Sequence, residues 1–475
     1  MERTKPKPLD NKNLPPSELA AKRYGTPEMA EIWGAEGTFS YILNSQEVSV
    51  RVISEKHPEI VSAEEAKEIK EAANLDVIDP NRIRELEEKT GHDVNAINIA
   101  LGEVVSPAAG RHINKFRASA DSTETAKGLQ LSDALLVIAD SISNLRDITL
   151  ERTMDWLNIP YMDTSHLYDA LPTVLGRPFS HYAEMLQSNL DFIEYVLKNS
   201  LYGKWADATG NYHSSTAFGI DGRELEDLYC ETLGLNHMDA PAQVPGREFL
   251  VYPVFALSIT SETLNNMARF IAINRSDDTG IFVYPKGKKG SSSMPHKDAK
   301  GGNPTAEEQV MSFANYMRGD MTTALCSCEF PYARNLSGSA SDRINFETMF
   351  KFGDHVIRRL AKVMYSIEPV EERSIERIER TYGTVTSQLV KTMLTERGEE
   401  YLTNQEADRL VAELATIAYD SKTNFTDVLL ASEEITSRFS EDEIKGMSDA
   451  FSYMGESKSI VQDVFKKYHG KSFNY

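Results

Sequence analysis

The sequence predicts an all-α protein whose centre is a bundle of long helices. Three segments far apart in the chain repeat apolar residues at alternating intervals of three and four, the spacing of a helix face that packs along its length against other helices. Patterns typical of β-strands are weak throughout. The apolar positions are Leu131, Leu135, Ile138, Ile142 and Leu145; Leu186, Leu190, Ile193 and Leu197; and Phe346, Phe350, Ile357, Leu360, Met364 and Ile367, with Gly353 at one position of the third series.

Helix faces of this length also predict an oligomer. A single copy would expose long apolar stripes, which soluble monomers rarely do. The bundle is therefore expected to continue between subunits, with near-parallel helices of several copies packed side by side.

The chain length predicts more than one domain. A chain of 475 residues is far longer than one ordinary hydrophobic core requires. From about residue 367 the long apolar series give way to short charged segments with helix caps, such as Ser440 with Glu443. This change in the sequence pattern predicts a smaller, separate helical domain at the C-terminal end.

The composition excludes several classes of function. Hydrophobic residues make up 41% and charged residues 26%, as in soluble globular proteins, and the net charge of −21 argues against a nucleic-acid partner. No apolar run is long enough to span a membrane, and residues 1–13 are polar and lysine-bearing rather than a signal segment. The three cysteines form no metal quartet, so a cytoplasmic protein without a metal is expected.

Cofactor motifs are also missing from the sequence. There is no G-x-G-x-x-G, no P-loop and no H-E-x-x-H, so the sequence predicts no dinucleotide, nucleoside-triphosphate or zinc site. We expect no cofactor.

The ordered part of the chain is expected to begin at Arg23 and Tyr24. Pro27 follows at a position suited to the first turn of a helix. Ser62 and Glu65 have the spacing of a capping box, which predicts the start of another helix.

Polar breaks between the helical segments provide the first candidate site residues. A histidine beside an aspartate in such a break is either functional or part of an ordinary surface turn, and a serine-rich cluster before a long helix is typical of an N-cap. Two later breaks, at 163–173 and 208–213, carry further polar donors. The candidates are His92 and Asp93, Ala118 and Ser119, His166, and Asn211.

An arginine-bearing break at 332–343 is a candidate phosphate site. Arg334 and Arg343 lie nine residues apart with hydroxyl side chains such as Ser339 between them, and a helix follows. Guanidinium groups bind oxyanions through two parallel hydrogen bonds, and a helix N-terminus adds backbone donors. An exposed turn capped by serines is the alternative interpretation.

The most unusual segment is the loop at 290–297, with the sequence G-S-S-S-M-P-H-K. Glycine and proline exclude a helix or strand interior, and three lysines at 286–289 precede the serines. Ser291, Ser292 and Lys297 are its candidate site residues. A loop with many donors and positive charge suits an anion, although a solvated basic loop would have the same composition.

This loop resembles the signature G-S-S-x-M-P-x-K-x-N-P of the fumarase/aspartase superfamily. Asn303 and Pro304 would be the closing pair, four residues later than the pattern requires. Five other segments resemble the adenylosuccinate lyase branch of that superfamily. They are Arg23-Tyr24 before Pro27-Glu28-Met29; Gly91-His92-Asp93-Val94; Ala118-Ser119-Ala120-Asp121, where the branch has T-S-S-D; Arg334 to Arg343, matching R-x-L-x-x-S-x-x-x-R; and Phe451-Ser452-Tyr453-Met454-Gly455 followed by Ile460-Val461.

The resemblance implies a three-domain, all-α fold. The expected domains are an N-terminal helical domain at 1–111, a central domain of long helices carrying the signature loop at 112–366, and a C-terminal helical domain at 367–475. The central helices would form a 20-helix core in a homotetramer. Residues of several subunits would then build each active site.

The resemblance also implies a reaction, the β-elimination of fumarate from adenylosuccinate or from the succinyl-carboxamide intermediate of purine synthesis. Ser291 would be the base and His166 the acid, with Lys297 stabilising the serine anion and His92 binding phosphate or orienting the acid. The other residues implied to bind the nucleotide or its succinyl group are Arg23, Tyr24, Asp93, Ala118, Ser119, Asn211, Ser292, Asn303, Arg334, Ser339 and Arg343.

Some residues depart from the family pattern. The family has T-H-x-Q-P-A around the acid, where this chain has S-H-L-Y-D-A at 165–170; Ala118 replaces a threonine; and Lys300 competes with Lys297 because of the insertion at 298–302. These departures leave two alternatives open. The chain could be another superfamily lyase or cycloisomerase, acting on argininosuccinate or carboxymuconate, or a nucleotide-binding paralogue without catalysis. The arginine-bearing segment argues against the first, and the combination of Ser291, His166 and Lys297 argues against the second.

Overall fold

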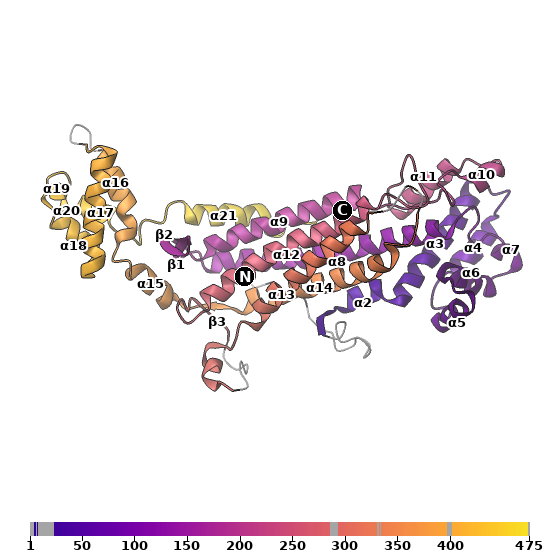
Figure 1. Ribbon diagram of the computed structural model, residues 1–475, viewed down its shortest axis with the longest axis horizontal. Helices are drawn as coiled ribbons and strands as arrows, with labels where there is room; N and C mark the ends of the chain where they lie inside the picture. The colour runs from indigo at the N-terminus through magenta and orange to yellow at the C-terminus, as the bar shows by residue number, and fades with distance from the viewer. Residues whose placement is uncertain are drawn as a thin grey trace.

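The structure is a computed structural model that describes residues 4–5, 7, 23–285, 293–329, 332, 334–396 and 401–473. The described chain is an elongated, almost entirely helical molecule, which confirms the predicted all-α class (Figure 1). Five long helices run side by side along its middle. They are α8 (Ser119–Asp155), α9 (Gly176–Asn199), α12 (Glu248–Asn274), α13 (Thr305–Cys326) and α14 (Ser339–Ser366).

The predicted apolar series form the core of this bundle. Leu131, Ile138 and Leu145 of α8 are fully buried against apolar side chains of the other long helices. The glycine in the third series, Gly353, lies where a Cβ atom would be 3.0 Å from Leu257 Cδ2 of α12. Its missing side chain therefore lets α14 approach α12 closely.

Shorter helices cover one end of the bundle and have a second hydrophobic core. Pro27 begins the first of them, and the capping box of Ser62 and Glu65 is present, as predicted. The second core also includes Trp205 and Tyr229 from the middle of the chain. The helices at this end are α2 (Pro27–Trp33), whose buried Met29 and Ile32 belong to the bundle core instead, and α3 (Ala35–Lys56), α4 (Ala63–Ala72), α5 (Pro80–Thr90), α6 (Asp93–Glu103), α7 (Pro107–Gly110), α10 (His213–Ala217) and α11 (Gly222–Leu233).

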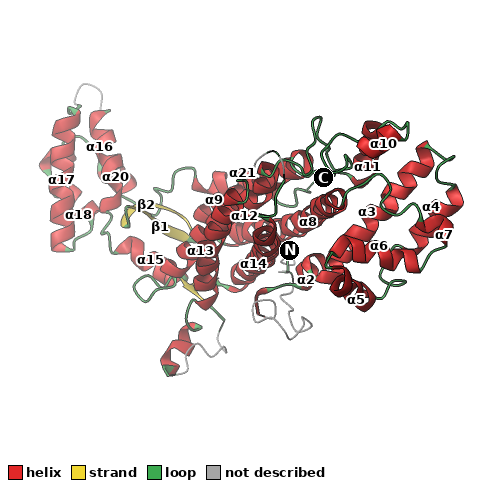
Figure 2. Cartoon of the chain, turned by 45° about the vertical axis from the view of Figure 1, so that its right-hand side comes forward, coloured by secondary structure: helices red, strands yellow, loops and turns green. Residues whose placement is uncertain are grey.

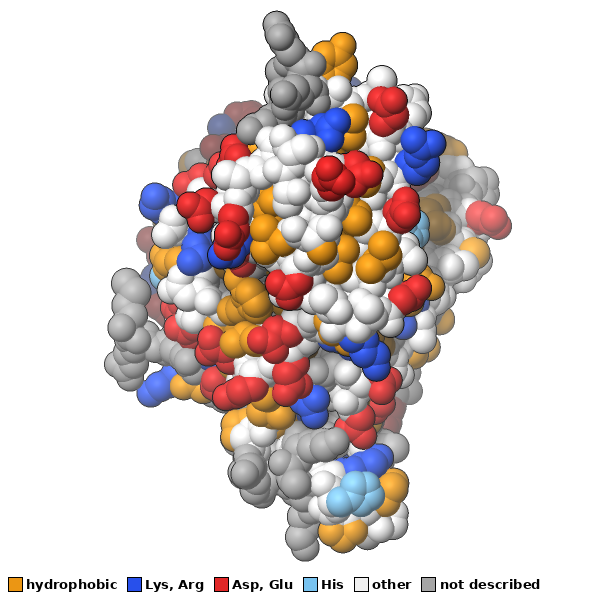
Figure 3. Space-filling view, turned by 90° about the vertical axis from the view of Figure 1, so that its left-hand side faces the viewer, with side chains coloured by type: hydrophobic (Ala, Val, Ile, Leu, Met, Phe, Trp, Pro, Cys, Tyr) orange, Lys and Arg blue, Asp and Glu red, His pale blue; other side chains and the backbone are white. Residues whose placement is uncertain are grey.

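The other end carries a separate group of short helices with its own core. Figure 3 looks onto this end, where acidic side chains are spread among apolar ones. The last helix returns to the bundle and packs on α8 and α9. The elements are α15 (Glu371–Glu379), η2 (Thr384–Thr386), α16 (Ser387–Thr395), α17 (Asn404–Ser421), α18 (Phe425–Leu430), α19 (Glu433–Thr436), α20 (Glu441–Met447) and α21 (Ser457–Tyr468).

The few strands of the described chain lie near α15 (Figure 2). β1 (Pro160–Ser165) and β2 (Tyr168–Val174) form an antiparallel hairpin between α8 and α9. β3 (Phe282–Val283) pairs with β4 (Glu368–Pro369) and leads into the loop that contains the 3₁₀ helix η1 (Pro295–Lys300). Within the described ranges, no helix combines the length and the apolar character needed to cross a bilayer.

Candidate active site

The predicted site residues fall into groups at different places along the bundle. Ser119 is the first residue of α8, and His166 lies in the hairpin that follows the last residue of α8. α8 has 37 residues, so at a rise of ~1.5 Å per residue it is about 55 Å long. Ser119 and His166 of one chain therefore lie at opposite ends of the bundle.

At the end where α8 begins, three helices bring four predicted residues together. His92 is the N-cap of α6, and its Nε2 atom lies 3.2 Å from Ser119 Oγ. Arg343 of α14 donates a hydrogen bond of 3.2 Å to Asp93 Oδ2, and its side chain is 70% exposed. Since α6 and α8 begin here and α14 begins one turn before Arg343, their N-terminal dipoles add to the positive charge of the guanidinium.

A buried ion network lies beneath this group. Arg247 donates to Glu124 Oε2 of α8 at 2.9 Å and to Asp342 Oδ2 of α14 at 2.6 Å, which ties the two helix starts together. Burial on its own would raise the pKa of Glu124, but Lys127, Arg247 and Arg334 hold it below its usual value. Arg334 therefore lies within electrostatic range of this network.

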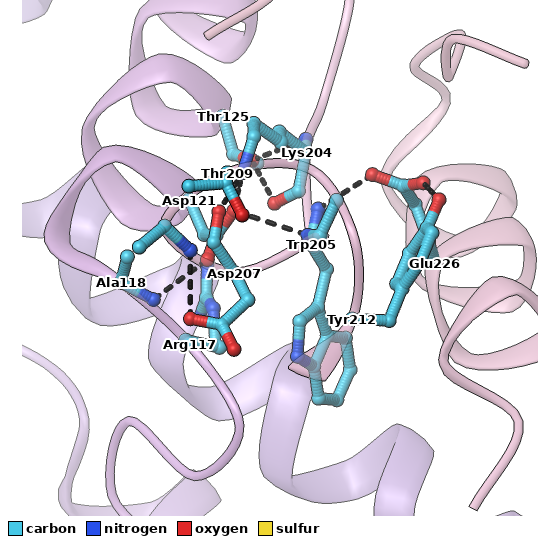
Figure 4. Close-up of polar contacts among 12 residues, drawn as sticks. Arg117, Ala118, Asp121, Thr125, Lys204, Trp205, Asp207, Thr209, Tyr212 and Glu226 are labelled. Atoms are coloured by element: carbon cyan, nitrogen blue, oxygen red, sulfur yellow. Dashed lines mark hydrogen bonds and ion pairs between the residues drawn. The ribbon is translucent and has the colours of Figure 1, made fainter. Parts of the chain in front are cut away.

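The start of α8 is also fixed to the turn that carries Asn211 (Figure 4). Asp121 accepts a hydrogen bond of 2.7 Å from the Ala118 backbone N–H and forms a fully buried ion pair with Lys204. Asn211 lies a few residues later, where its side-chain Nδ2 donates to the backbone oxygen of Thr209 at 3.1 Å. The predicted residues Ala118, Ser119 and Asn211 thus belong to the same end of the bundle.

His166 occupies the tip of the β1–β2 hairpin. Ser165 pairs with Tyr168, so His166 and Leu167 form a two-residue turn, with φ of 53° and 68°. Such turns usually contain Asn-Gly, because positive φ costs other residues free energy. Leu167 and Tyr168 are also 84% and 81% exposed. Backbone strain and exposed apolar side chains at one tip are typical of a functional element that contacts something else.

The hairpin is held close to its tip by the aspartate that departs from the family pattern, since Asp169 pairs with Thr164 one position beyond the turn-flanking pair. Asp169 accepts a hydrogen bond of 2.8 Å from Arg377 Nε and one of 2.9 Å from Arg380 Nη2, at the end of α15. Its carboxylate therefore anchors the hairpin to the C-terminal part of the chain.

The loop residues form a third group, at the root of the signature loop. Lys297 Nζ donates to Asn303 Oδ1 at 3.1 Å. The following glycine turn is anchored by Arg275, which donates to the Gly302 backbone oxygen at 3.2 Å and to Glu307 Oε1 at 2.8 Å. Ser291 and Ser292 lie outside the described residues.

Tyr24, which follows Arg23, packs against α13 and α14 at a point farther from the start of α14 than Arg343. The Tyr24 ring is 5.0 Å from that of Phe313 and 5.5 Å from that of His355, between centroids. His355 is twelve residues after Arg343, which corresponds to about 18 Å of helix. Ser339, in contrast, is the first residue of α14, one turn before Arg343.

Several buried charges that organise these groups were not predicted from the sequence. A buried ion pair has no periodic signal, because its charges look the same in a sequence as those of a solvated helix face. The residues that sequence reasoning missed are Lys204, Arg247, Asp342, Arg275 and Glu307, and Asp121 was noted only as part of a motif, without its buried ion pair.

The sequence matches known lyases over most of its length. A family model described as Lyase matches residues 22–319. The adenylosuccinate lyase of Methanocaldococcus jannaschii is 26% identical over 454 residues, covering 95% of this chain and 96% of the relative. The adenylosuccinate lyase of Bacillus subtilis is 27% identical, covering 92% of this chain and 97% of the relative.

The fold is shared with solved structures. A fumarate lyase from Mesorhizobium sp. BNC1 superposes with a TM-score of 0.82 at 18% identity, covering 94% of this chain and 99% of that one. A 3-carboxy-cis,cis-muconate lactonizing enzyme from Pseudomonas putida gives a TM-score of 0.82 at 21% identity, covering 95% and 98%. The family match spans more than half of the chain, and the chain therefore belongs to the Lyase family and is a lyase with the all-helical fold of the fumarase/aspartase superfamily.

Proposed function

We propose that this lyase eliminates fumarate from adenylosuccinate to give AMP, and performs the same elimination on the succinyl-carboxamide ribonucleotide of purine synthesis. The observation that carries the proposal is the exposed Arg343 beside the His92–Ser119 contact, where α6, α8 and α14 begin. A guanidinium and three helix N-termini suit a phosphate dianion. The names of the relatives point to the same substrate.

The chemistry needs a base and an acid. In this proposal Ser291 removes a proton from the carbon next to one succinyl carboxylate, the carbon–nitrogen bond breaks, and His166 protonates the leaving nitrogen. The products are AMP and fumarate. Lys297 stabilises the serine anion, a role supported by its place at the loop root beside Asn303. No cofactor takes part.

These groups can serve one site only if several subunits contribute to it. Ser119 and His166 of one chain are separated by the length of α8, which no nucleotide spans. A neighbouring copy in the opposite direction would place its hairpin tip beside α6 and the start of α8. We therefore propose a homotetramer with shared active sites.

Exposed apolar side chains on the long helices support this assembly. They lie on α9, α12, α13 and α14, the helices expected to pack between subunits. They are Tyr195, Tyr252, Phe255, Ile259, Ile273, Tyr316, Leu325 and Ile344.

Mixing two inactive variants tests the proposed reaction and the shared site together. His166→Ala and Ser119→Ala proteins are assayed for adenylosuccinate cleavage by absorbance, separately and after co-refolding. Each variant alone is expected to be nearly inactive, whereas random mixing restores both groups in about one quarter of the sites.

Two outcomes contradict the proposal. If the mixture is no more active than the separate variants, the site is not shared between these two residues. If the wild type cleaves argininosuccinate or converts carboxymuconate but leaves adenylosuccinate intact, the substrate is wrong and the superfamily alternative applies.

A further inference from the structure

Arg359 of α14 is a partly buried cation that no described residue pairs with. Its Nε atom is buried and has no hydrogen-bond partner among the described residues. The adjacent Arg358 differs, since it donates to Asp354 Oδ1 at 3.0 Å and to Glu28 Oε1 at 3.1 Å. Two neighbouring arginines on one helix are therefore in opposite states, one fully paired and the other not.

The surroundings of Arg359 contain further unpaired polar atoms. His355 lies one helical turn earlier on the same face, is 3% exposed, and has no partner for its Nδ1 atom within the described ranges. Its Nε2 atom lies 3.3 Å from Gln309 Oε1. The hydroxyl of Tyr284 is likewise buried and has no well-formed hydrogen bond within the described ranges; burial and the nearby Glu307 carboxylate raise its pKa.

Residues of three other segments influence the charge of Arg359. Burial lowers the pKa of Arg359, while Tyr284, Glu307 and Tyr24 oppose that shift. Glu307 stabilises the charged form of Arg359, but its described ion pair is with Arg275, at 2.8 Å, and its Oε2 atom has no hydrogen-bond partner among the described residues. A guanidinium removed from water without a paired anion is costly, so an anion bound here would stabilise the arrangement.

The position of this cluster connects it with the signature loop. Arg275 covers the face of the Tyr284 ring, with its Cζ atom 3.9 Å from the ring centroid. A Cβ atom on Gly301 would lie 2.5 Å from Tyr284 Cβ, and Gly301 has a φ of +81°. The glycine turn that follows Lys297 therefore rests directly on Tyr284.

We propose that Arg359, Tyr284 and His355 form an oxyanion-binding subsite, bordered by Tyr24, at the root of the loop that carries Lys297. Resting on the proposed function, it assigns one anionic group of the substrate, a carboxylate or the phosphate, to Arg359. The guanidinium offers two parallel donors to either group, and the Tyr284 hydroxyl adds a third.

Anion binding by the full-length protein tests the subsite without turnover. The melting temperature Tm is followed while succinate, inorganic phosphate or AMP is added at constant ionic strength, with chloride as the ionic control. Wild-type protein is expected to show saturable stabilisation by at least one of these anions. Arg359→Gln is expected to weaken that binding about tenfold or more, and Arg359→Lys to recover part of it.

The same titration identifies the anion and separates binding from folding. A loss confined to succinate assigns a carboxylate to Arg359. A loss confined to phosphate and AMP assigns the phosphate to Arg359 and overturns its assignment to Arg343. Arg358→Gln is the matched control, because it breaks two ion pairs and should lower Tm while leaving the anion affinity unchanged. Tyr284→Phe, which removes only the hydroxyl, should weaken the same anion even if Arg359→Gln fails to fold.

The subsite is overturned if no anion stabilises the wild type in a saturable way, or if Arg359→Gln and Tyr284→Phe bind all three anions as tightly as the wild type. Adenylosuccinate cleavage is measured in parallel. If the wild type cleaves adenylosuccinate and the variants bind the anions as tightly as the wild type does, only the subsite is refuted. Anion binding that depends on Arg359 in a protein that does not cleave adenylosuccinate refutes only the proposed reaction.

Discussion

The Nε2 atom of His92 lies 3.2 Å from the Oγ atom of Ser119, although the two residues are 27 positions apart and begin different helices. The contact links the start of α6 to the start of α8. The hydrogen bond from Arg343 to Asp93 adds α14 to the same group. An anion at this point would therefore meet one exposed cation and the N-terminal backbone of several helices.

Arg343→Ala is expected to raise KM for adenylosuccinate about tenfold to a hundredfold, the loss of one or two charge-assisted hydrogen bonds. A cation on a remote phosphate supports the ground state and the transition state alike, so kcat should fall less than KM rises. Steady-state kinetics measure both constants. Tm should hardly change, because the ion pair with Asp93 is exposed.

A matched control for Arg343→Ala is Arg373→Ala. It removes an exposed arginine that is paired with Glu376 on α15, far from the contact between His92 and Ser119. It should leave KM unchanged. If a substrate analogue without phosphate binds the wild type as well as AMP does, Arg343 does not bind phosphate.

Asp169→Asn is expected to lower kcat about tenfold while KM changes little, because the hairpin would hold His166 less well and the phosphate end is untouched. The variant removes the charge that Arg377 and Arg380 bind. Arg377→Gln should have a similar effect, and the double variant should lose little more than either single one. Additive losses in kcat would mean that Asp169 acts on the reaction independently of the arginine.

The long helices were predictable because their signal is local and repeated. Leu131 and Leu145 of α8 belong to one series of buried positions, and such a series survives in the sequence without knowledge of the partner helices. Helix starts were predictable for the same reason, as at Ser62 and Glu65, where the capping residues are three positions apart.

The hairpin at 160–174 was not predicted as strands, and its sequence explains why. Proline occupies positions 160 and 172, and the turn residues His166 and Leu167 replace the usual Asn-Gly. The grouping of site residues was also hidden, since the contact between Asp93 and Arg343 joins positions 250 apart. Only the packing of three helices brings these two residues together.

Acid is expected to destabilise the protein through His355. Burial, with Arg359 nearby, lowers the pKa of His355 to about 4, whereas an unfolded histidine titrates near ~6.5. Between those values the unfolded chain binds a proton that the folded chain does not, so the free energy of unfolding falls by up to about 1.4 kcal/mol per pH unit as the pH decreases.

Comparing wild type with His355→Gln over the pH range isolates this contribution. The variant has no titrating group at position 355, so its Tm should fall less steeply between pH 6.5 and 4. Parallel Tm curves for the two proteins in that range would show that His355 does not cause the loss of stability.

Ser291→Ala is expected to abolish elimination and leave substrate affinity nearly unchanged, because in the proposed mechanism the hydroxyl contacts only the proton that is removed. His166→Ala should also reduce kcat severely, since the leaving nitrogen would depart without a proton. The double variant should be no worse than the more damaged single variant, because both groups serve one coupled step. Substrate affinity is measured directly by calorimetry on the inactive proteins.

The neighbouring serines provide the control for that assignment. Ser292→Ala and Ser293→Ala change the same side chain in the same loop, and both are expected to retain turnover because only one hydroxyl acts as the base. If Ser292→Ala or Ser293→Ala is inactive while Ser291→Ala is active, the base is the serine whose replacement abolishes turnover. If all three variants are active, the loop does not supply the base. The exposed histidine at the tip of the hairpin that Asp169 anchors would then need a different partner for proton removal.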